Sequence, residues 1–393
     1  MTNEEFIAQN KDADVHALAL SKAPENIDLH YCLKQIEGRQ IALRKLPLWT
    51  KTEGIIYPSK LSMEQCSSEK TALYKQQLVE RLLPEERQSM VDLTGGFGID
   101  FSFLAQLFEE ADYVERNGQL CEIARHNFPL LGLPKSKIHC KACEEFIDEM
   151  GHYSLIYLDP SRRDAAGRKM VALSDCTPNI ETLQDTLLSH SPLVIVKLSP
   201  MLDIQDTLRR LPNAGEVHVV SVDGECKEML LVLCREKKDI TYHCTNITAQ
   251  TQTFCTKARS AEPIIASHPE HYLYEPNASI LKAGVQDVLC QTHNIKKLHP
   301  FSHLFTSEQL IADFPGRIFV IEDYCGFAKK DQKRLLAGIS QCNLTIRNFP
   351  SSVAELRKQL KLREGGNIYL FATTLSDGSH ALLRCSLPIN SLL

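Results

Sequence analysis

The feature that most constrains the fold is a regular alternation of short β-rich runs with helix-length segments, which begins near Ser89. The runs are Met90–Leu93, Ala111–Glu115, Ile138–Lys141, Leu155–Leu158, Leu193–Lys197, Val217–Val222 and Met229–Cys234. Five strands that alternate with helices imply parallel βαβ units. The last two runs flank Asp223-Gly224, a hairpin-type turn, and add an antiparallel edge. The sequence therefore predicts an α/β, Rossmann-like sheet of seven strands, with its ligand at the carboxyl ends of the strands.

The segments before this sheet have helical spacing. Apolar residues such as Phe6, Val15 and Leu33 recur with a helical period over residues 1 to about 60, which predicts a small helical domain. Ser62-x-x-Gln65 has the form of a capping box, and the pattern from Met63 to Leu83 predicts one long helix after it.

The segment after residue 235 has a mixed pattern. A Thr-rich stretch over Thr241–Thr256 opens it. Strands at Ile318–Ile321, Asn343–Asn348 and Asn367–Thr373 then alternate with basic helices at Lys329–Ile339 and Val353–Leu360. We expect a helical domain over residues 1–62, the α/β domain over 63–236, and α+β modules over 237–322 and 323–393.

Cysteine usage and hydropathy bear on where the protein works. The 14 Cys are scattered and form no pair of CxxC motifs, which favours reduced core thiols in the cytoplasm. No secretory signal opens the chain, and no apolar run reaches the 18 or so residues that cross a bilayer. The dispersed histidines lack partners at metal-ligand spacing, so no metal is expected.

The charge is divided unevenly along the chain. From Arg235 to the end there are 19 Lys and Arg against 14 Asp and Glu, a balance of +5, whereas the preceding 234 residues carry −10. Lys329, Lys330, Lys333 and Arg334 make one basic helix face, and Arg357, Lys358, Lys361 and Arg363 make a second. A basic end on an acidic body is compatible with contact to nucleic acid phosphates, although a solvated helix face explains either cluster equally well.

The densest motif follows the first strand and reads Asp92-Leu93-Thr94-Gly95-Gly96-Phe97-Gly98-Ile99-Asp100. Glycines let the backbone approach a ligand and adopt a positive φ where a side chain would clash. Glu115 closes the second strand, 23 positions after Asp92, where an acid that holds a ribose diol is expected. The third glycine of a dinucleotide fingerprint is missing, and Asp100 stands near the start of the helix. This pattern fits S-adenosylmethionine (SAM) better than NAD.

The fourth strand ends in Asp159-Pro160-Ser161-Arg162-Arg163. Here the chain resembles the class I SAM-dependent methyltransferases, in which the acid and a prolyl carbonyl of this motif orient the group that is methylated. Ser161 stands where the motif of base-amine methyltransferases has a second Pro, and Arg162 where it has an aromatic residue. The resemblance makes Asp159, Pro160 and Arg162 the catalytic candidates. It makes Asp92, Thr94, Gly95, Gly96, Phe97, Gly98, Asp100 and Glu115 the cofactor-binding candidates.

A second resemblance covers about 330 residues. It rests on the order and spacing of Gln65–Glu69, Asp92–Asp100, Asp159–Arg163, Lys197–Met201 and Tyr272–Asn277. These segments resemble the bacterial, Bacteroidetes-type THUMP-like domain methyltransferases. The resemblance implies SAM as the cofactor, a ferredoxin-like module followed by a THUMP-like module, and RNA (tRNA or rRNA) as the partner. It also places Ser68 near the methionine end of SAM, where helix capping is the alternative role.

Two basic residues beside the expected methyl donor are substrate-binding candidates. Arg163, like Arg162, could clamp a phosphate or carboxylate of the substrate, or could be a solvated loop charge. Lys197 ends the fifth strand, and a structural ion pair with Asp159 is favoured over a role as catalytic base. Two alternative functions stay open: a small-molecule methyltransferase, and a non-catalytic RNA-binding protein on a SAM-fold scaffold. The acceptor atom and the oligomeric state are not indicated by the sequence.

Overall fold

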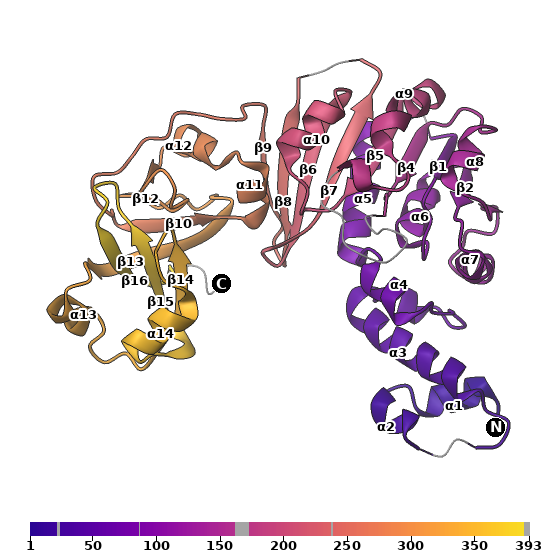
Figure 1. Cartoon of the computed structure of the whole chain (residues 1–393), viewed down its shortest axis with the longest axis horizontal. Helices are drawn as coiled ribbons and strands as arrows, with labels where there is room; N and C mark the ends of the chain where they lie inside the picture. The colour runs from indigo at the N-terminus through magenta and orange to yellow at the C-terminus, as the bar shows by residue number, and fades with distance from the viewer. Residues whose placement is uncertain (22–23, 86, 162–172, 237–238, 389–393) are drawn as a thin grey trace. The chain divides into compact units, whose positions relative to one another are not determined.

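A computed structural model describes residues 1–21, 24–85, 87–161, 173–236 and 239–388 of the chain. Two compact units divide it: unit 1 is Met1–Val217 with Glu228–Asp239, and unit 2 is His218–Lys227 with Ile240–Leu393 (Figure 1). None of the helices in the described ranges is long and apolar enough to cross a membrane.

Unit 1 contains the predicted parallel sheet. Its strands are β1 (Ser89–Asp92), β2 (Glu110–Val114), β3 (Lys137–His139), β4 (Leu155–Leu158), β5 (Leu193–Leu198), β6 (Ala214–Val222) and β7 (Glu225–Cys234), the last two running on into unit 2. β3, β2, β1, β4 and β5 are neighbours in that order and are parallel, and β7 is antiparallel to β5. The order reverses between β1 and β4, as in other doubly wound sheets. All seven predicted strands are therefore present.

The prediction of a seven-stranded sheet was incomplete, because the strand order continues to nine: β3-β2-β1-β4-β5-β7-β6-β8-β9. β8 (Thr241–Ile247) and β9 (Gln252–Thr256) form a hairpin from the Thr-rich stretch. An edge strand presents unpaired backbone groups, and β8 covers those of β6 in unit 2. The Ser221 hydroxyl, which donates to the Thr245 carbonyl at 3.2 Å, adds a side-chain contact there.

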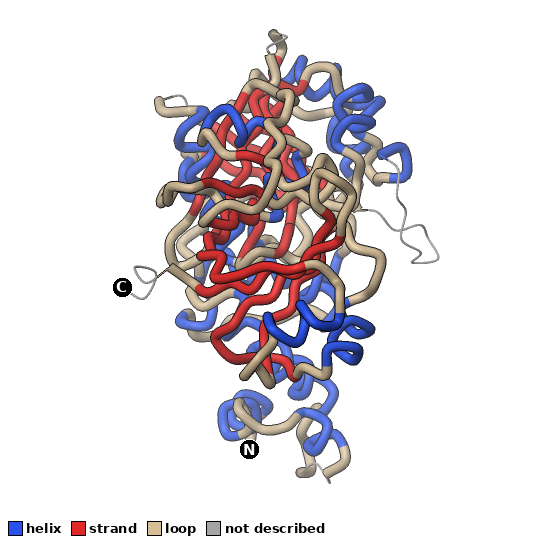
Figure 2. The backbone as a smooth tube through the Cα atoms, turned by 90° about the vertical axis from the view of Figure 1, so that its left-hand side faces the viewer, coloured by secondary structure: helices blue, strands red, loops and turns tan. Residues whose placement is uncertain are grey.

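The helices of unit 1 cover the sheet and form the N-terminal end of the chain. They are α1 (Asn3–Gln9), α2 (Val15–Ala19), α3 (Leu29–Lys45), α4 (Lys60–Gln65), α5 (Glu69–Leu82), α6 (Ile99–Leu104), α7 (Gly118–Leu130), α8 (Cys143–Ile147), α9 (Ile180–His190) and α10 (Ile204–Arg210). Apolar side chains of α5, α6 and α7 pack against the strands in one core. Figure 2 shows the chain around α1 and α2 as helices and loops without strands.

The predicted single helix from Met63 to Leu83 was wrong, because the chain forms two helices there. Cys66 and Ser68 adopt extended backbone angles, and Ser68 caps α5 by accepting the Thr71 N–H at 3.3 Å. The predicted cap at Ser62 is also wrong, because Ser59 accepts the first-turn N–H of α4. The interruption puts residues 66–68 beside the sheet instead of inside a helix.

The N-terminal region has two cores. Phe6, Cys32 and Ile36 form a small one with the apolar side chains of α1–α3. Farther along the chain, Trp49 and Tyr57 pack instead against Phe97 in the turn after β1. The segment that precedes α5 therefore shares a core with the glycine-rich turn.

Unit 2 contains a second sheet, with the order β11-β12-β10-β13-β16-β15-β14. These strands are β10 (Tyr272–Pro276), β11 (Lys296–Lys297), β12 (Phe305–Ser307), β13 (Gly316–Cys325), β14 (Gln341–Arg347), β15 (Arg363–Thr374) and β16 (His380–Ser386). Its helices are α11 (Ala278–Ala283), α12 (Leu289–Thr292), α13 (Lys329–Leu335) and α14 (Val353–Leu360). Two apolar clusters, around Phe319 and around Leu356, form its cores. The strands and helices predicted after residue 316 are all present.

Candidate active site

A cavity of about 690 Å³ lies at the carboxyl ends of β1, β2, β4 and β5. This is where a doubly wound sheet places its ligand, and the volume suits a small-molecule cofactor. The residues around it come from the turn after β1, the segments after β2 and β3, the end of β4, β5, and the interruption between α4 and α5. They include Cys66, Ser67, Asp92–Asp100, Glu115–Asn117, Leu120, Ala142–Glu144, Tyr157, Asp159–Ser161 and Lys197.

The turn after β1 is held close to its neighbours by glycines. Gly98 begins α6 with φ of +84°, and a side chain there would meet the Phe128 ring at 2.8 Å. A Cβ on Gly95 would meet the Tyr113 ring at 2.1 Å. The turn therefore lies against the aromatic core on one side, and its residues line the cavity on the other.

Glu115 at the end of β2 fixes the same turn. Its carboxylate accepts the N–H of Gly96 at 2.9 Å and the N–H of Asn117 at 2.7 Å. The Tyr113 hydroxyl donates to the Gly96 carbonyl, so both backbone groups of Gly96 are held. Glu115 lines the cavity at the position where the sequence predicts an acid.

Asp92 is a buried carboxyl at the end of β1, with 1% of its surface exposed. Its Oδ1 accepts the Thr94 N–H at 2.9 Å. Burial raises the pKa of Asp92 well above its ordinary value, and the hydrogen bond from Thr94 opposes this only in part. A buried carboxyl of this kind is suited to receive a cationic group from a ligand in the cavity.

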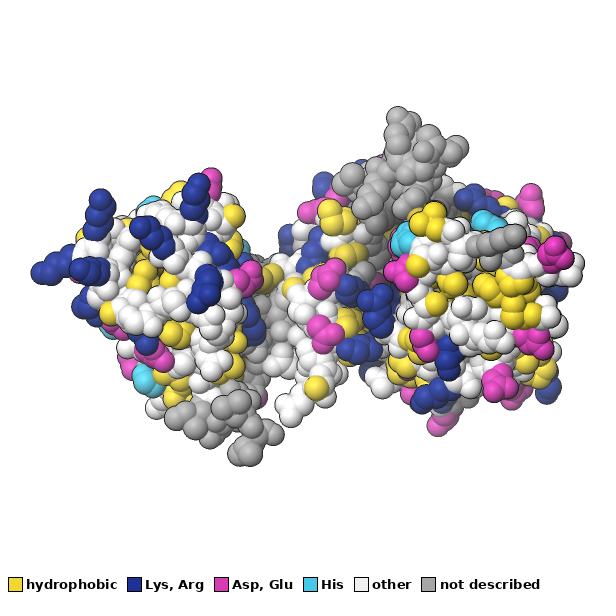
Figure 3. Space-filling view, turned by 90° about the horizontal axis from the view of Figure 1, so that it is seen from below, with side chains coloured by type: hydrophobic (Ala, Val, Ile, Leu, Met, Phe, Trp, Pro, Cys, Tyr) yellow, Lys and Arg dark blue, Asp and Glu magenta, His cyan; other side chains and the backbone are white. Residues whose placement is uncertain are grey.

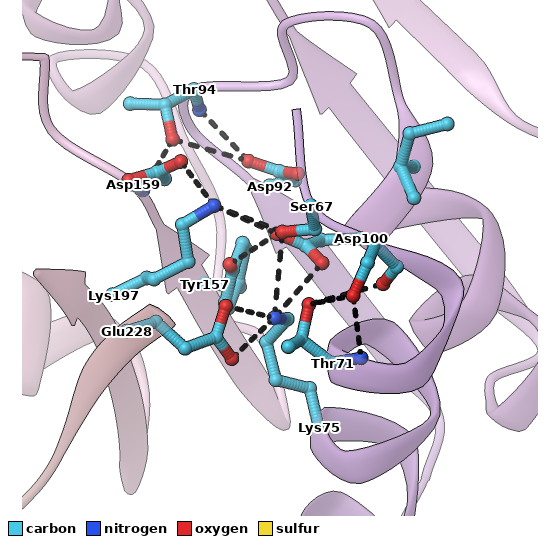
Figure 4. A network of polar contacts seen from close by, with 12 residues as sticks. Ser67, Thr71, Lys75, Asp92, Thr94, Asp100, Tyr157, Asp159, Lys197 and Glu228 are labelled. Carbon is cyan, nitrogen blue, oxygen red and sulfur yellow. Dashed lines mark hydrogen bonds and ion pairs between the residues drawn. The ribbon is translucent and has the colours of Figure 1, made fainter. Parts of the chain in front are cut away.

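Thr94 connects the turn to the end of β4. Its hydroxyl accepts the backbone N–H of Asp159 at 2.6 Å and faces Asp92 Oδ1 at 3.4 Å (Figure 4). One side chain therefore sets the position of the Asp159 backbone relative to the glycine-rich turn. Because the two loops are fixed to each other, ligands bound by each would be held in a constant relation.

Lys197 on β5 points toward Asp159, and the expected ion pair is present. Its Nζ lies 2.5 Å from Asp159 Oδ2 and 3.3 Å from Asp100 Oδ2. Burial lowers the pKa of Lys197, but Asp159, Asp100 and Glu228 raise it more, so that it lies well above its ordinary value. Lys197 is therefore held as an ammonium group and does not accept a proton near neutral pH.

Asp100 lies at the centre of a buried polar network (Figure 4). Its Oδ2 accepts hydrogen bonds from the Ser67 hydroxyl at 2.7 Å and from the Tyr157 hydroxyl at 2.7 Å. Burial raises its pKa, but Lys75 and Lys197 lower it more, so that it lies well below its ordinary value. Asp100 also lines the cavity, and it contacts the side chains of Ser67, Tyr157, Lys75 and Lys197.

Sequence reasoning missed three members of this network: Lys75, Tyr157 and Glu228. Lys75 on α5 faces Glu228 on β7 at 2.6 and 2.8 Å, and Asp100 Oδ1 at 3.2 Å. One signal could have found Lys75, since it falls on the apolar face of its helix with Thr71, Ala72, Leu78 and Val79. Tyr157 and Glu228 occur in β-rich runs, where nothing in the pattern marks a polar contact.

The remaining candidates divide into those near the cavity and those outside the described residues. Phe97 is buried against Trp49. Both Phe97 and Pro160 line the cavity. Ser68 caps α5 and does not line the cavity, whereas its neighbour Ser67 does. Arg162 and Arg163 lie outside the described residues.

Comparisons with known proteins agree with this architecture. Residues 272–315 match a ferredoxin-like domain family, and residues 316–387 match a THUMP domain-like family. A crystal structure from Porphyromonas gingivalis W83, of a protein assigned as a methyltransferase, is 33% identical, with a TM-score of 0.86 over 98% of this chain and 97% of that chain. No curated protein matches the chain significantly.

Two other solved structures resemble part of the chain. A SAM-dependent methyltransferase from Agrobacterium tumefaciens is 16% identical, with a TM-score of 0.32 over 42% of this chain and 62% of that one. A Pyrococcus horikoshii protein assigned as an RNA methyltransferase is 14% identical, with a TM-score of 0.35 over 51% of this chain and 98% of that one. Family membership rests on the Porphyromonas gingivalis structure.

Proposed function

This chain belongs to the bacterial THUMP-like domain family of class I SAM-dependent methyltransferases, and from that premise we propose that it uses SAM to methylate RNA. One observation carries the proposal. A glycine-rich turn, a buried carboxyl at Asp92 and an acid at Glu115 surround the same cavity as Asp159 and Pro160. Donor and acceptor groups of a methyl transfer need this proximity.

The residues on the cofactor side fit SAM. The backbone over Thr94–Gly98 would lie along the ligand, because this turn lines the cavity and its glycines let it pack closely on the aromatic core behind it. Asp92 would face the ammonium of the methionine moiety, and Glu115 would bind the ribose hydroxyls. When bound, SAM supplies a methyl group made electrophilic by its sulfonium sulfur.

The residues on the acceptor side are Asp159 and Pro160. The Asp159 side chain is 38% exposed, and its carboxylate is paired with the Lys197 ammonium. In this arrangement Asp159 acts by accepting a hydrogen bond from the group to be methylated and fixing its orientation. Lys197 holds the Asp159 carboxylate in place. We therefore propose that Lys197 acts on the substrate indirectly, through Asp159.

The RNA partner is proposed from unit 2. Its THUMP-like module carries Lys and Arg side chains on α13 and α14, but the second predicted face is only partly helical, because Lys361 follows α14 and Arg363 begins β15. Figure 3 shows Lys and Arg side chains standing out on the surface of this module, at the left. Exposed cations without an aromatic platform favour contacts with phosphates, which do not depend on base sequence. From the sequence patterns we also propose domains over residues 1–62, 63–236, 237–322 and 323–393, and a cytoplasmic location.

The test is transfer of a tritiated methyl group from SAM to RNA extracted from bacteria. We expect incorporation that falls as salt rises from 50 to 200 mM, because phosphate contacts are lost. The matched control is Asp159→Ala, which should bind SAM but incorporate no label. Label that enters only a small-molecule fraction would replace RNA with a small acceptor, and no transfer to any fraction despite SAM binding would favour a scaffold role.

A further inference from the structure

Five charged side chains of alternating sign form a continuous run in unit 1 (Figure 4). In order they are Glu228, Lys75, Asp100, Lys197 and Asp159. The successive oxygen–nitrogen distances are 2.6 Å, 3.2 Å, 3.3 Å and 2.5 Å. The elements joined are β7, α5, α6, β5 and the end of β4. One end of the run is deep in the protein, and the other opens into the cavity.

The deep end has no access to a ligand. Lys75 is 0% exposed and Glu228 is buried, and neither is among the residues around the cavity. Burying two charges costs more free energy than the ion pair usually returns, and an apolar pair of the same volume is often as stable. Stability alone is therefore a poor reason for a lysine and a glutamate at these two positions.

Resting on the proposed function, we infer that Lys75 and Glu228 are positioning residues for Asp159, acting through Asp100 and Lys197. Lys75 shares Asp100 with Lys197. With one cation already on Asp100, the Lys197 ammonium is left free to stay 2.5 Å from Asp159. Glu228 in turn balances the charge of Lys75 and holds its Nζ with both carboxylate oxygens.

Replacing Lys75 should change how Asp100 and Asp159 share the Lys197 ammonium group. Asp100 would draw Lys197 toward itself, and Asp159 would lose part of its cation. Among the described residues, Asp92 on β1 and Tyr157 on β4 also interact with Asp159, and both would remain. Lys197 Nζ should therefore lie closer to Asp100 and farther from Asp159.

Replacing Glu228 should have the opposite effect on the position of the Lys197 ammonium group. Burial raises the pKa of Glu228, and the neighbouring Lys75 opposes that rise. Replacing Glu228 with Gln removes a negative charge while keeping the shape. Lys75 then acts on Asp100 without competition, and Lys197 Nζ should stay closer to Asp159.

The experiment follows the Lys197 ammonium by NMR in the full chain labelled with ¹⁵N-lysine. Buried, paired ammonium groups exchange slowly enough to be seen, and the Lys197 signal is identified by its absence in Lys197→Met. In Asp159→Asn the same signal gives the chemical shift of this ammonium group without its ion pair to Asp159. We expect the Lys197 signal to move toward that position in Lys75→Met, and to move by a smaller amount in the opposite direction in Glu228→Gln.

Two further variants separate positioning from loss of structure. Lys75→Met/Glu228→Met replaces the pair with apolar side chains and should stay folded, with the Lys197 signal moved as in Lys75→Met. Lys297→Met removes the buried Lys297 from its pair with Asp287 in unit 2 and should leave the Lys197 signal unchanged. An unchanged Lys197 signal in the folded double variant, or a movement in the same direction in Lys75→Met and Glu228→Gln, would overturn the inference.

The proposed function is tested separately, by SAM binding to the unaltered chain. Binding of SAM with no movement of the Lys197 signal in the variants would remove the positioning role alone. Movement of the signal without any SAM binding would leave the coupling of the charges intact and remove the methyltransferase assignment on which its purpose rests.

Discussion

The two units of the chain bury charge in different ways. In unit 1 Glu228, Lys75, Asp100 and Lys197 join in one run that ends in the cavity at Asp159. The buried Asp112 lies outside this run and contacts His139 and Tyr153. In unit 2 the buried charges stay in separate groups: Lys297 pairs with Asp287, and Glu275 is held between Arg317 and Arg347. A separate pair can only fix two elements to each other. A run that reaches a cavity can also set the charge of a group that meets a ligand.

The largest expected effect of breaking the unit 1 run is on catalysis. Asp159→Ala should reduce methyl transfer by about 10²–10⁴-fold, because the acceptor loses the carboxylate that orients it. SAM affinity should change by less than about threefold, since Asp159 is assigned to the acceptor. Kinetics of label transfer and calorimetry measure the two quantities.

The matched change in unit 2 is Asp287→Ala, which opens a pair without touching the cavity. Methyl transfer per folded molecule should be unchanged. A loss of SAM affinity in Asp159→Ala would instead assign this residue to the cofactor.

The second comparison concerns stability and uses the two buried lysines. Lys75→Met should lower the free energy of unfolding by about 3–5 kcal/mol, because it leaves the buried Glu228 without its ion-pair partner and Asp100 with Lys197 alone. Lys297→Met should cost less, about 1–2 kcal/mol, because the Asp287 side chain is 28% exposed and can be hydrated. Scanning calorimetry of the two variants measures this difference, and equal losses would contradict it.

The third comparison concerns glycines at positive φ. Gly98→Ala adds a Cβ that meets Phe128 at 2.8 Å, so the turn must move, and SAM affinity should fall by about tenfold. Gly284 in unit 2 has φ of +73° and open space around it. Gly284→Ala should therefore cost a similar backbone strain with no effect on SAM binding. Equal SAM affinities for the two variants would show that the turn does not shape the site.

The smallest expected effect is a pH dependence that comes from Asp92. Burial raises the pKa of Asp92. At a pH below this raised pKa, most molecules carry Asp92 in its protonated form. A cationic ligand favours the ionised form, and binding should release up to one proton. The apparent affinity for SAM should therefore rise with pH, by at most about tenfold per unit, until the folded pKa is passed.

Titrations in buffers of different ionisation enthalpy measure the released proton directly. Asp92→Asn should abolish both the proton release and the pH dependence. No Asp in unit 2 lines this cavity, so pH should not act on SAM binding from there. An affinity that does not change with pH in the unaltered chain would contradict the role of Asp92.

Much of the fold could be predicted because hydrophobic period and turn chemistry are local. The seven strands up to Cys234 and the helix over Val353–Leu360 follow from such patterns. The break at residues 66–68 was missed because Cys66 and Ser67 are compatible with helix, and only their contacts beside the sheet favour extended backbone. β8 and β9 were missed because pairing with an edge strand is a tertiary event.

The candidate site was predictable where it is continuous in sequence. Asp92–Asp100 and Asp159-Pro160 line one cavity, and the pair between Lys197 and Asp159 was expected from a lysine at a strand end. The deep half of the charge run was not predictable. Lys75 and Glu228 are 153 residues apart, and nothing local indicates that one buried charge has the other as its partner.

The central claim is that this cavity binds SAM, and calorimetric titration of the full chain with SAM and S-adenosylhomocysteine tests it most directly. The account predicts one site with micromolar affinity, lost in Gly96→Arg while that variant stays folded. Trp49, the only tryptophan of the chain, lies with its ring centroid 4.9 Å from that of Phe97, so its fluorescence should change on the same titration. No binding to the folded chain, or equal binding to Gly96→Arg, would contradict the account.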